Sequence, residues 1–349
     1  MQIRRSKLVG TLLAGALVLA ACGGDDTADS ADADTTEDET EDADEGGEDE
    51  ASGGEEFEVY ALLPQGSDQP YGTTYLPPFE ETAGELGLNL TITNSQYDAD
   101  TQASDCEVAV AAQPDGIILW PAVADTIRPC LTAAEAAGIP VTITNSDVLE
   151  EDAELTAAYS GPDTYGQGVA SAELMCELAG DDEVGIIMVN GLTGNTTAID
   201  RENGFEDTIN EQCPNVEILA RQPGNWNKDE SQIAASEMIT SVGAENIDGA
   251  YAADDTMVAG VIDAFKARDI AVEDLLITSI GNTELGNPLV ISGELDGTVF
   301  QSSSWDGENA AQTMYDVLTG DSDERVVAFM PDVKVTADNA EDPEVAPEW

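Results

Sequence analysis

Residues 113–145 read QPDGIILWPAVADTIRPCLTAAEAAGIPVTITN and contain one complete strand–helix–strand unit. The apolar runs 116–120 and 139–145 have the length and the β-branched content of buried strands. Between them, 126–137 has the length of a helix, and Gly138 is suited to end it because glycine adopts left-handed backbone angles without strain. Two strands joined by a helix in this way predict a parallel βαβ unit.

The same alternation continues on both sides of this unit. Further strand-like runs cover 57–63, 88–93, 184–189, 216–220, 249–253, 275–280 and 297–301, and further helical patterns cover 77–86, 101–112, 166–178, 197–210, 231–241, 257–267 and 306–318. So many units exceed one comfortable sheet, and about 290 residues is near the size at which a single core divides. We therefore predict an α/β fold of two doubly wound parallel-sheet lobes, with a site beyond the carboxyl ends of their strands.

The first 22 residues have the pattern of an export signal. Three basic residues within the first seven precede the apolar run 8–21, which is too short to span a bilayer. The run leads into Leu-Ala-Ala-Cys at 19–22, which resembles the bacterial lipobox, where the cysteine thiol is acylated and the chain is cut before it. An ordinary signal peptide with a chance cysteine is the alternative. We expect an extracytoplasmic protein held at the cell membrane by lipid on Cys22.

The chain is strongly acidic, with a formal net charge of −61 and no histidine. Residues 23–56 contain 17 Asp or Glu and no Lys or Arg, which predicts a disordered, extended tether. Residues 57–349 carry a formal charge of −47, which argues against nucleic acid and anionic lipid surfaces as partners because both require basic residues. Self-repulsion of this size is relieved at high ionic strength, and we infer a salt-adapted host as a hypothesis.

Four further cysteines follow Cys22, namely Cys106, Cys130, Cys176 and Cys213. An even number in an exported chain predicts two disulfides, for which three connectivities are possible, with buried free thiols as the alternative. We favour Cys106–Cys130 and Cys176–Cys213 because each pair then stays within one predicted half.

Several segments of the body carry a resemblance to known proteins. They are DQPY at 68–71, QPDGIILWP at 113–121, AAGIPV at 136–141, Asp163 with YGQG at 165–168, RENGF at 201–205, ADDTMVAG at 253–260, GEL at 293–295, TVFQ at 298–301 and the segment 333–339. In this order they resemble the periplasmic ribose/galactose-binding protein family, the type 1 solute-binding proteins of ABC sugar transporters. The resemblance covers nearly all of 57–339. It implies discontinuous lobes, 57–161 with 302–328 and 162–301 with 329–349, joined by three crossovers that form a hinge.

This resemblance implies a binding protein rather than an enzyme. Such a protein closes on its ligand by bending at the hinge, and a membrane permease with a separate ATPase reads the closed form. The chain has no Gly-x-x-x-x-Gly-Lys-Ser/Thr motif and cannot supply that ATPase itself. We expect a monomer that captures a sugar or a similar polyhydroxylated molecule and needs no cofactor or metal.

Ten residues match or adjoin the family's ligand contacts. They are Gln65, Gln69, Tyr71, Trp120, Asn145, Arg201, Trp226, Asp254, Asn282 and Gln301. The resemblance implies that Arg201 and Asp254 bond to ligand hydroxyls while Tyr71 and Trp226 cover the apolar faces of a ring. Trp120 is either a third aromatic plate or a cap on the first lobe. Asp255 is assigned to the N-cap of the following helix.

Two departures from the family pattern bear on the ligand. Gly72 replaces a second aromatic residue, and Asn145-Ser146 replaces an Asp-Arg pair of ribose binders, so the pocket is not tuned for ribose. Two alternatives stay open. The same fold could bind an amino acid, a nucleoside or an autoinducer, with Arg201 and Asp254 as a carboxylate and ammonium clamp. A glycosidase that uses two carboxylates is the other, because the chain has neither histidine nor Gly-x-Ser-x-Gly.

Overall fold

The computed structural model describes residues 56–320 and 324–349. The predicted signal, the lipidation site Cys22 and the predicted tether, apart from Glu56, lie outside these residues. Within the described part, none of the helices combines the length and the apolar character needed to cross a bilayer.

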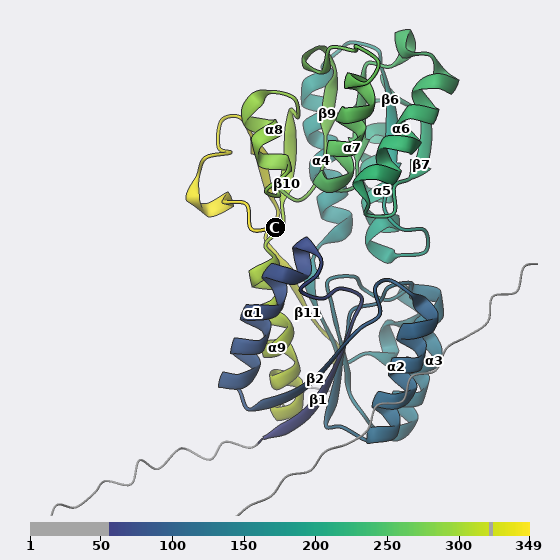
Figure 1. The fold of residues 1–349 in the computed structure, drawn as a ribbon. Helices are drawn as coiled ribbons and strands as arrows, with labels where there is room; N and C mark the ends of the chain where they lie inside the picture. Colours follow the sequence, from purple (N-terminus) through teal and green to yellow (C-terminus); the bar gives the residue numbers. More distant parts are fainter. Residues whose placement is uncertain (1–55, 321–323) are drawn as a thin grey trace, which may run out of the picture. The chain divides into compact units, whose positions relative to one another are not determined.

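Six strands form the first sheet, in the order β11-β5-β4-β3-β1-β2, and every pair of neighbours is parallel. The strands are β1 (Phe57–Leu63), β2 (Leu88–Asn94), β3 (Gly116–Leu119), β4 (Val141–Thr144), β5 (Ala158–Pro162) and β11 (Val326–Met330). Its helices are α1 (Pro70–Glu85), α2 (Ala99–Ala112), α3 (Ala124–Ala137) and α9 (Ser303–Thr319). Helices α1 and α9 pack together on one face and α2 and α3 on the other (Figure 1). Strands β3 and β4 are therefore buried at every position.

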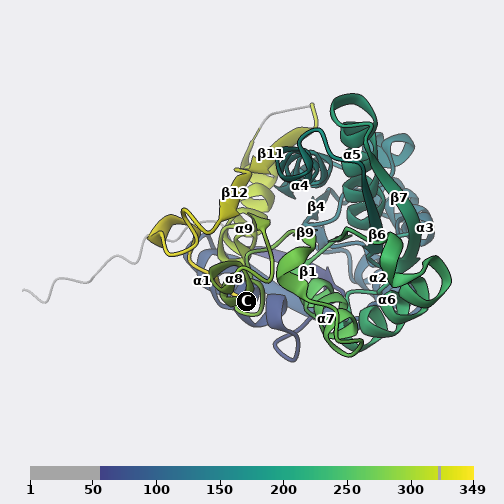
Figure 2. The same cartoon turned by 90° about the horizontal axis from the view of Figure 1, so that it is seen from above.

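The second sheet has the order β12-β10-β9-β8-β6-β7. Its strands are β6 (Val184–Asn190), β7 (Val216–Pro223), β8 (Gly249–Ala252), β9 (Leu276–Thr278), β10 (Gly297–Phe300) and β12 (Val333–Thr336). Its helices are α4 (Thr164–Ala179), α5 (Thr196–Gln212), α6 (Lys228–Val242), α7 (Asp255–Lys266) and α8 (Gly286–Ser292). Helices α4 and α5 cover one face, and α6 and α7 the other (Figure 2). Short 3-10 turns lie at η1 (Glu150–Leu155), η2 (Ala244–Asn246), η3 (Val272–Asp274) and η4 (Pro343–Val345).

The chain crosses between the sheets three times, after β5, after β10 and after β11. The third crossing gives the one departure from an all-parallel arrangement among the described strands, because β12 is antiparallel to β10. Strand β11 runs parallel to β5 in the first sheet, and the chain passes from the carboxyl end of β11 directly into β12 of the second sheet. Strand β12 therefore enters the second sheet from the side where the other strands of that sheet end. The predicted class, two α/β lobes joined by a three-crossover hinge, is confirmed.

Helix α1 begins earlier than the predicted helix over 77–86. Its buried positions include Tyr71, Tyr75, Phe79 and Ala83, one every four residues. This stripe packs against α9 and the first sheet, and it runs through Pro77 and Pro78. A proline inside a helix costs about 3 kcal/mol, so burial of the large aromatic side chains outweighs the local preference. As a result Tyr71 lies in the first turn of a helix rather than in a loop.

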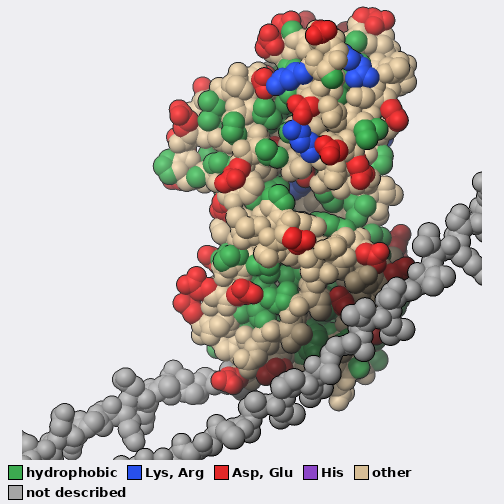
Figure 3. All heavy atoms as spheres, in the orientation of Figure 1, with side chains coloured by type: hydrophobic (Ala, Val, Ile, Leu, Met, Phe, Trp, Pro, Cys, Tyr) green, Lys and Arg blue, Asp and Glu red, His purple; other side chains and the backbone are tan. Residues whose placement is uncertain are grey.

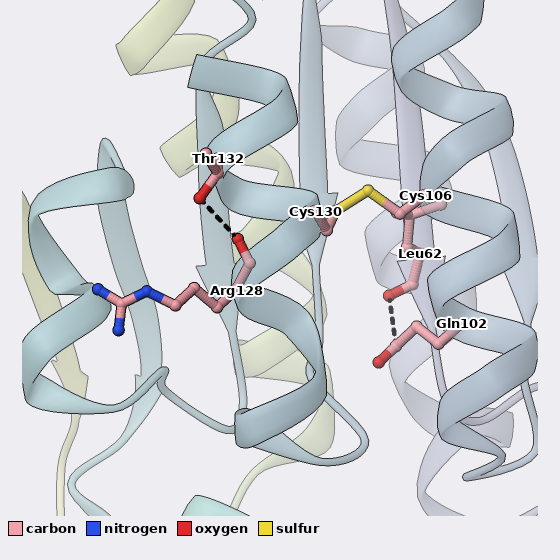
Figure 4. The surroundings of a disulfide bond; sticks show 6 residues. All are labelled: Leu62, Gln102, Cys106, Arg128, Cys130 and Thr132. Atoms are coloured by element: carbon pink, nitrogen blue, oxygen red, sulfur yellow. Dashed lines mark hydrogen bonds between the residues drawn. A yellow bond between two sulfur atoms is a disulfide. The ribbon is translucent and has the colours of Figure 1, made fainter. Parts of the chain in front are cut away.

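Two disulfides are present, and their pairing is the one favoured from the sequence. Cys106–Cys130 joins α2 to α3 on the first sheet (Figure 4), and Cys176–Cys213 joins the end of α4 to the residue after α5. They close chain separations of 24 and 37 residues, and loops of this length imply roughly 3–4 kcal/mol of stabilisation each. Each disulfide therefore stabilises one lobe and leaves the crossings free to bend.

Candidate ligand-binding cleft

A cavity of about 320 Å³ lies between the two lobes, where the parallel strands of both sheets end. It is lined by Gln65, Gln69, Pro70, Tyr71, Tyr97, Trp120, Asn145, Ser146, Asn195, Thr197, Arg201, Asn225, Trp226, Asn227, Asp254, Thr256, Gln301 and Trp349. This volume is at the small end of the roughly 300–1,000 Å³ typical of small-molecule sites. The lining combines amides, hydroxyls and aromatic rings with one arginine and one aspartate, so it suits a small polar ligand.

All of the predicted site residues other than Asn282 line this cavity. Asn282 is fully buried within the second lobe. Its Nδ2 donates to the Val345 carbonyl, and its Oδ1 accepts from Asn287 at 3.1 Å. Gly281 and Asn282 both have positive φ, so the chain turns three residues beyond the end of β9. The structure corrects this assignment, since the side chain holds the segment near η4 against α8 rather than facing the cavity.

Arg201 projects from α5 and is only 3% exposed. Its Nε and one Nη donate to the Gln167 side-chain oxygen, at 3.1 and 2.7 Å, and its other Nη donates to the Ala253 carbonyl at 2.7 Å. Gln301 accepts a further bond. Burial lowers the pKa of Arg201, but an arginine keeps its charge in proteins. Within the described residues no carboxylate lies at ion-pair distance, so this buried cation is available to an acceptor on a ligand.

The N-cap role predicted for Asp255 belongs to its neighbour Asp254. Asp254 is the N-cap of α7, where its Oδ1 accepts from the Met257 amide at 2.7 Å, and it also lines the cavity. Asp255 is sealed in the second lobe, where it accepts from Ser279, Thr283 and Thr298. Burial raises the pKa of Asp254 to about 7 and that of Asp255 to about 6. Asp254 is therefore both a helix cap and a cavity carboxylate.

Aromatic rings reach the cavity from both lobes. In the first lobe, Tyr71 meets Trp120 edge-to-face, with ring centroids 5.5 Å apart. Trp120 both packs in that lobe's core and lines the cavity. Its buried Nε1 has no hydrogen-bond partner in the described part of the chain.

Trp226 lines the cavity from the second lobe, with the Arg201 guanidinium 5.9 Å from its ring centroid. It stands in the loop between β7 and α6, where Asn225 and Trp226 both have positive φ, 53° and 57°. The ring lies so close to Gly191 that a Cβ at that position would be 2.1 Å from it. Only glycine at position 191 allows this placement of the indole.

Asp306, on α9, organises the first-lobe side of the cavity. Its Oδ2 accepts from the Tyr71 hydroxyl and from Asn145 Nδ2, both at 2.7 Å, and its Oδ1 accepts from Thr144 at 3.1 Å. Gln301 Nε2 donates to the same Tyr71 hydroxyl at 3.1 Å and its Oε1 accepts from Arg201. A continuous series of hydrogen bonds thus runs from Asp306 in one lobe to Arg201 in the other.

The lobes also meet at the rim of the cavity. Asn195 Nδ2 donates to the Ala122 carbonyl at 3.2 Å, and the Ser146 and Thr197 hydroxyls lie 2.8 Å apart. Thr196 donates to the Asp147 carbonyl. Since these bonds join the two lobes across the cleft, the structure corresponds to the closed form of a hinged protein.

Several lining residues carry little or no signal in the sequence. Asn225 and Asn227 flank the predicted Trp226, and Ser146 follows the predicted Asn145, so their neighbours indicate them. Tyr97 and Trp349 lie far along the chain from every recognised motif. Asp306, which contacts the lining side chains from behind, is one of 72 acidic residues.

The buried carboxyls predict that folding stability rises when the pH falls from 7.5 to 5. Burial raises the pKa of Asp254 to about 7 and those of Asp255 and Asp306 to about 6, above an ordinary 3.8. The folded state then binds protons more tightly than the unfolded state, so the stabilisation is complete below pH 3.8 and lost as pH rises through 6–7. Glu206, whose pKa is lowered by Arg221, acts oppositely but only below pH 4.5.

Urea unfolding at pH 5, 6, 7 and 8, at fixed ionic strength, measures this dependence. Asp254→Asn is the matched variant, because Asn caps a helix as well as Asp does and does not titrate. We expect a shallower pH dependence in that variant. A wild-type stability that decreases steadily from pH 8 to 5 contradicts the prediction.

Two joined α/β lobes that enclose a polar and aromatic cavity define a hinge-closing solute-binding protein. The model of the periplasmic binding protein domain matches residues 60–322, and the chain belongs to this family.

Individual relatives agree with this membership. The chain is 27% identical over 256 residues to the xylitol-binding protein of Mycolicibacterium smegmatis, covering 73% of this chain and 70% of the relative. It is 24% identical over 282 residues to a ribose import binding protein of Haemophilus influenzae, covering 80% and 92%. Among solved structures, an ABC transporter solute-binding protein from Bacillus halodurans with bound myo-inositol has a TM-score of 0.75 at 21% identity, covering 84% of this chain and 99% of that one. The last likeness concerns the fold alone.

Proposed function

We propose that this protein is the extracytoplasmic solute-binding component of an ABC-type importer and captures a sugar or a similar polyhydroxylated molecule by hinge closure. The observation that carries the proposal is the closed interlobe cavity, whose lining combines Arg201 and Asp254 with amide side chains and with aromatic rings from both lobes. Sugar hydroxyls donate and accept, and the C–H faces of a sugar ring pack on aromatic planes. The named ligands of the two sequence relatives, xylitol and ribose, belong to the same chemical class.

Binding without catalysis fits the cavity better than glycoside hydrolysis. Glycosidases use two carboxyl groups about 5–9.5 Å apart on either side of the scissile bond. Of the described residues that line the cavity, Asp254 alone has a carboxylate side chain. The Asp306 carboxylate does not line the cavity and already accepts hydrogen bonds from Tyr71, Asn145 and Thr144. We therefore infer that the protein releases its ligand unchanged to a membrane permease.

We further propose that the mature protein is a monomer anchored by lipid on Cys22. The signal-like sequence of residues 1–22 and the acidic run that follows support an anchor with a long tether. Intact mass spectrometry of the protein from bacterial membranes tests this. Acylation that persists in a Cys22→Ser variant contradicts the assignment.

A thermal-shift screen tests the function directly, because a ligand that binds only the folded state raises the melting temperature. The panel holds pentoses, hexoses, polyols, nucleosides and amino acids. A shift of about 5 °C or more with a sugar or polyol supports the proposal. A shift with amino acids alone assigns the Arg201–Asp254 pair to a carboxylate and ammonium clamp and contradicts it.

The acidic surface predicts that stability rises with salt. In the view of Figure 3, Asp and Glu side chains are scattered over both lobes, while the visible Lys and Arg side chains lie on the second lobe. The screening length falls from about 10 Å at 0.1 M to 3 Å at 1 M ionic strength, so repulsion within a body of formal charge −47 decreases. We expect a higher melting temperature in 2 M KCl than in 0.1 M KCl. An unchanged or lower value removes the inference of a salt-adapted host.

A further inference from the structure

The segment 346–349 joins the two lobes beside the cavity. It follows η4, where Val345 packs in the core of the second lobe. Four residues later, Trp349 packs against the core of the first lobe. The label C in Figure 1 marks this position at the junction between the sheets. The segment therefore contacts both halves of the molecule at the hinge side of the site.

The Glu348 carboxylate is held by four donors at the start of α9. Its Oε1 accepts from the hydroxyls of Ser302 and Ser304, at 2.8 and 2.9 Å. Its Oε2 accepts from the Ser303 hydroxyl at 3.1 Å and from the Ser304 amide at 2.9 Å. The unpaired N–H groups at a helix start favour a negative charge, which strengthens these bonds. Glu348 is thereby fixed to the first lobe.

This attachment sets the position of the neighbouring Trp349. The indole Nε1 donates to the Gln301 carbonyl at 3.0 Å, and the Trp349 carbonyl accepts from the Glu284 amide at 2.6 Å. The ring packs against the Tyr71 ring in a T-shaped arrangement, with centroids 4.9 Å apart and an interplanar angle of 74°. Trp349 is thus held from both lobes while it lines the cavity.

We propose that Trp349 is a fixed wall of the ligand site that limits ligand size, and that Glu348 is the residue that positions it. The inference rests on the proposed function and names a further determinant of that same site. A wall bonded to both lobes cannot withdraw without breaking the bonds of Glu348 and Trp349. A single sugar ring packs against the indole, whereas a second ring attached on that side is excluded.

Calorimetric titrations of the full chain test the proposal with D-ribose, L-arabinose, D-fructose, xylitol and myo-inositol as small probes and maltose as the large probe. Trp349→Ala is expected to weaken binding of the tightest-binding small probe about tenfold. It is also expected to raise the affinity for maltose relative to the affinity for that probe. Trp349→Phe keeps a ring and is expected to stay within about threefold of wild type. Trp349→Ala with both affinities unchanged overturns the proposal.

Glu348 is tested by a matched pair of variants. Glu348→Ala is expected to reproduce the ligand effects of Trp349→Ala, whereas Glu348→Gln retains an acceptor for the Ser304 amide and is expected to bind as wild type does. Hydrogen exchange of the Ser304 amide, followed by NMR, reports whether its hydrogen bond to Glu348 is intact, and it needs no ligand. It is expected to be slow in wild type and Glu348→Gln and about tenfold faster in Glu348→Ala.

The two proposals fail in different ways. A wild-type chain that binds none of the small probes contradicts the proposed function. In that case the exchange rates decide the inference about the segment, since equal Ser304 rates in wild type and Glu348→Ala overturn it whatever the ligand is.

Discussion

Replacing Arg201 by Gln is expected to weaken binding of the best small ligand by about 10- to 100-fold, because charge-assisted hydrogen bonds contribute about 1.5–3 kcal/mol. The side chain is buried, has no carboxylate at ion-pair distance among the described residues, and lines the cavity. We therefore expect the Arg201 guanidinium to donate a hydrogen bond to a ligand hydroxyl. Calorimetric titration of the ligand found in the screen measures the loss.

The same substitution also removes bonds within the protein. The Ala253 carbonyl and the Gln301 side-chain oxygen lose their donor, so we expect the free energy of unfolding to fall by about 1–3 kcal/mol. Urea unfolding separates this from the loss of affinity. Arg221→Gln is the matched control, because Arg221 lies in an exposed cluster with Glu202 and Glu206, outside the cavity. Arg201→Gln with wild-type affinity refutes the site assignment.

Replacing Asp306 by Ala is expected to lower the free energy of unfolding by about 2–4 kcal/mol and to weaken ligand binding about tenfold or more. The change leaves the Tyr71 hydroxyl and the Asn145 amide without their acceptor inside the closed protein, and each unsatisfied buried group costs about 1–3 kcal/mol. Both side chains line the cavity, so their displacement reaches the ligand. Urea unfolding and calorimetry measure the two effects.

Asp306→Asn separates the geometry of this contact from its charge. The Asn oxygen can still accept from Tyr71 and Asn145, and its amide can donate to the Thr144 hydroxyl, which is able to accept. We expect affinity within about threefold of wild type and a weaker pH dependence of stability. If Asn and Ala at this position reduce affinity equally, the charge of Asp306 matters and the positioning role proposed for it is wrong.

The elements that the sequence predicted well are those whose signal is local. The unit at 113–145 combines β-branched strands, a helix of ordinary length and a terminal glycine, and each feature acts within a few residues. The same holds for the strand ends that carry Asp254 and Trp120. Helix α1 was placed too late because its two prolines are a local signal, whereas its early start depends on packing against α9.

The sequence by itself determined two α/β lobes, the class of protein, an acidic body and half of the side chains around the cavity, because alternation, charge and motifs are properties of neighbouring residues. Tertiary structure alone decided which of two adjacent aspartates caps α7, that Asn282 turns away from the cavity, and that Asp306 and Trp349 belong at the site. Asp306 contacts Asn145 across 161 positions and Trp349 contacts Gln301 across 48. Such contacts follow from how α9 and segment 346–349 pack at the hinge, and no local pattern encodes that packing.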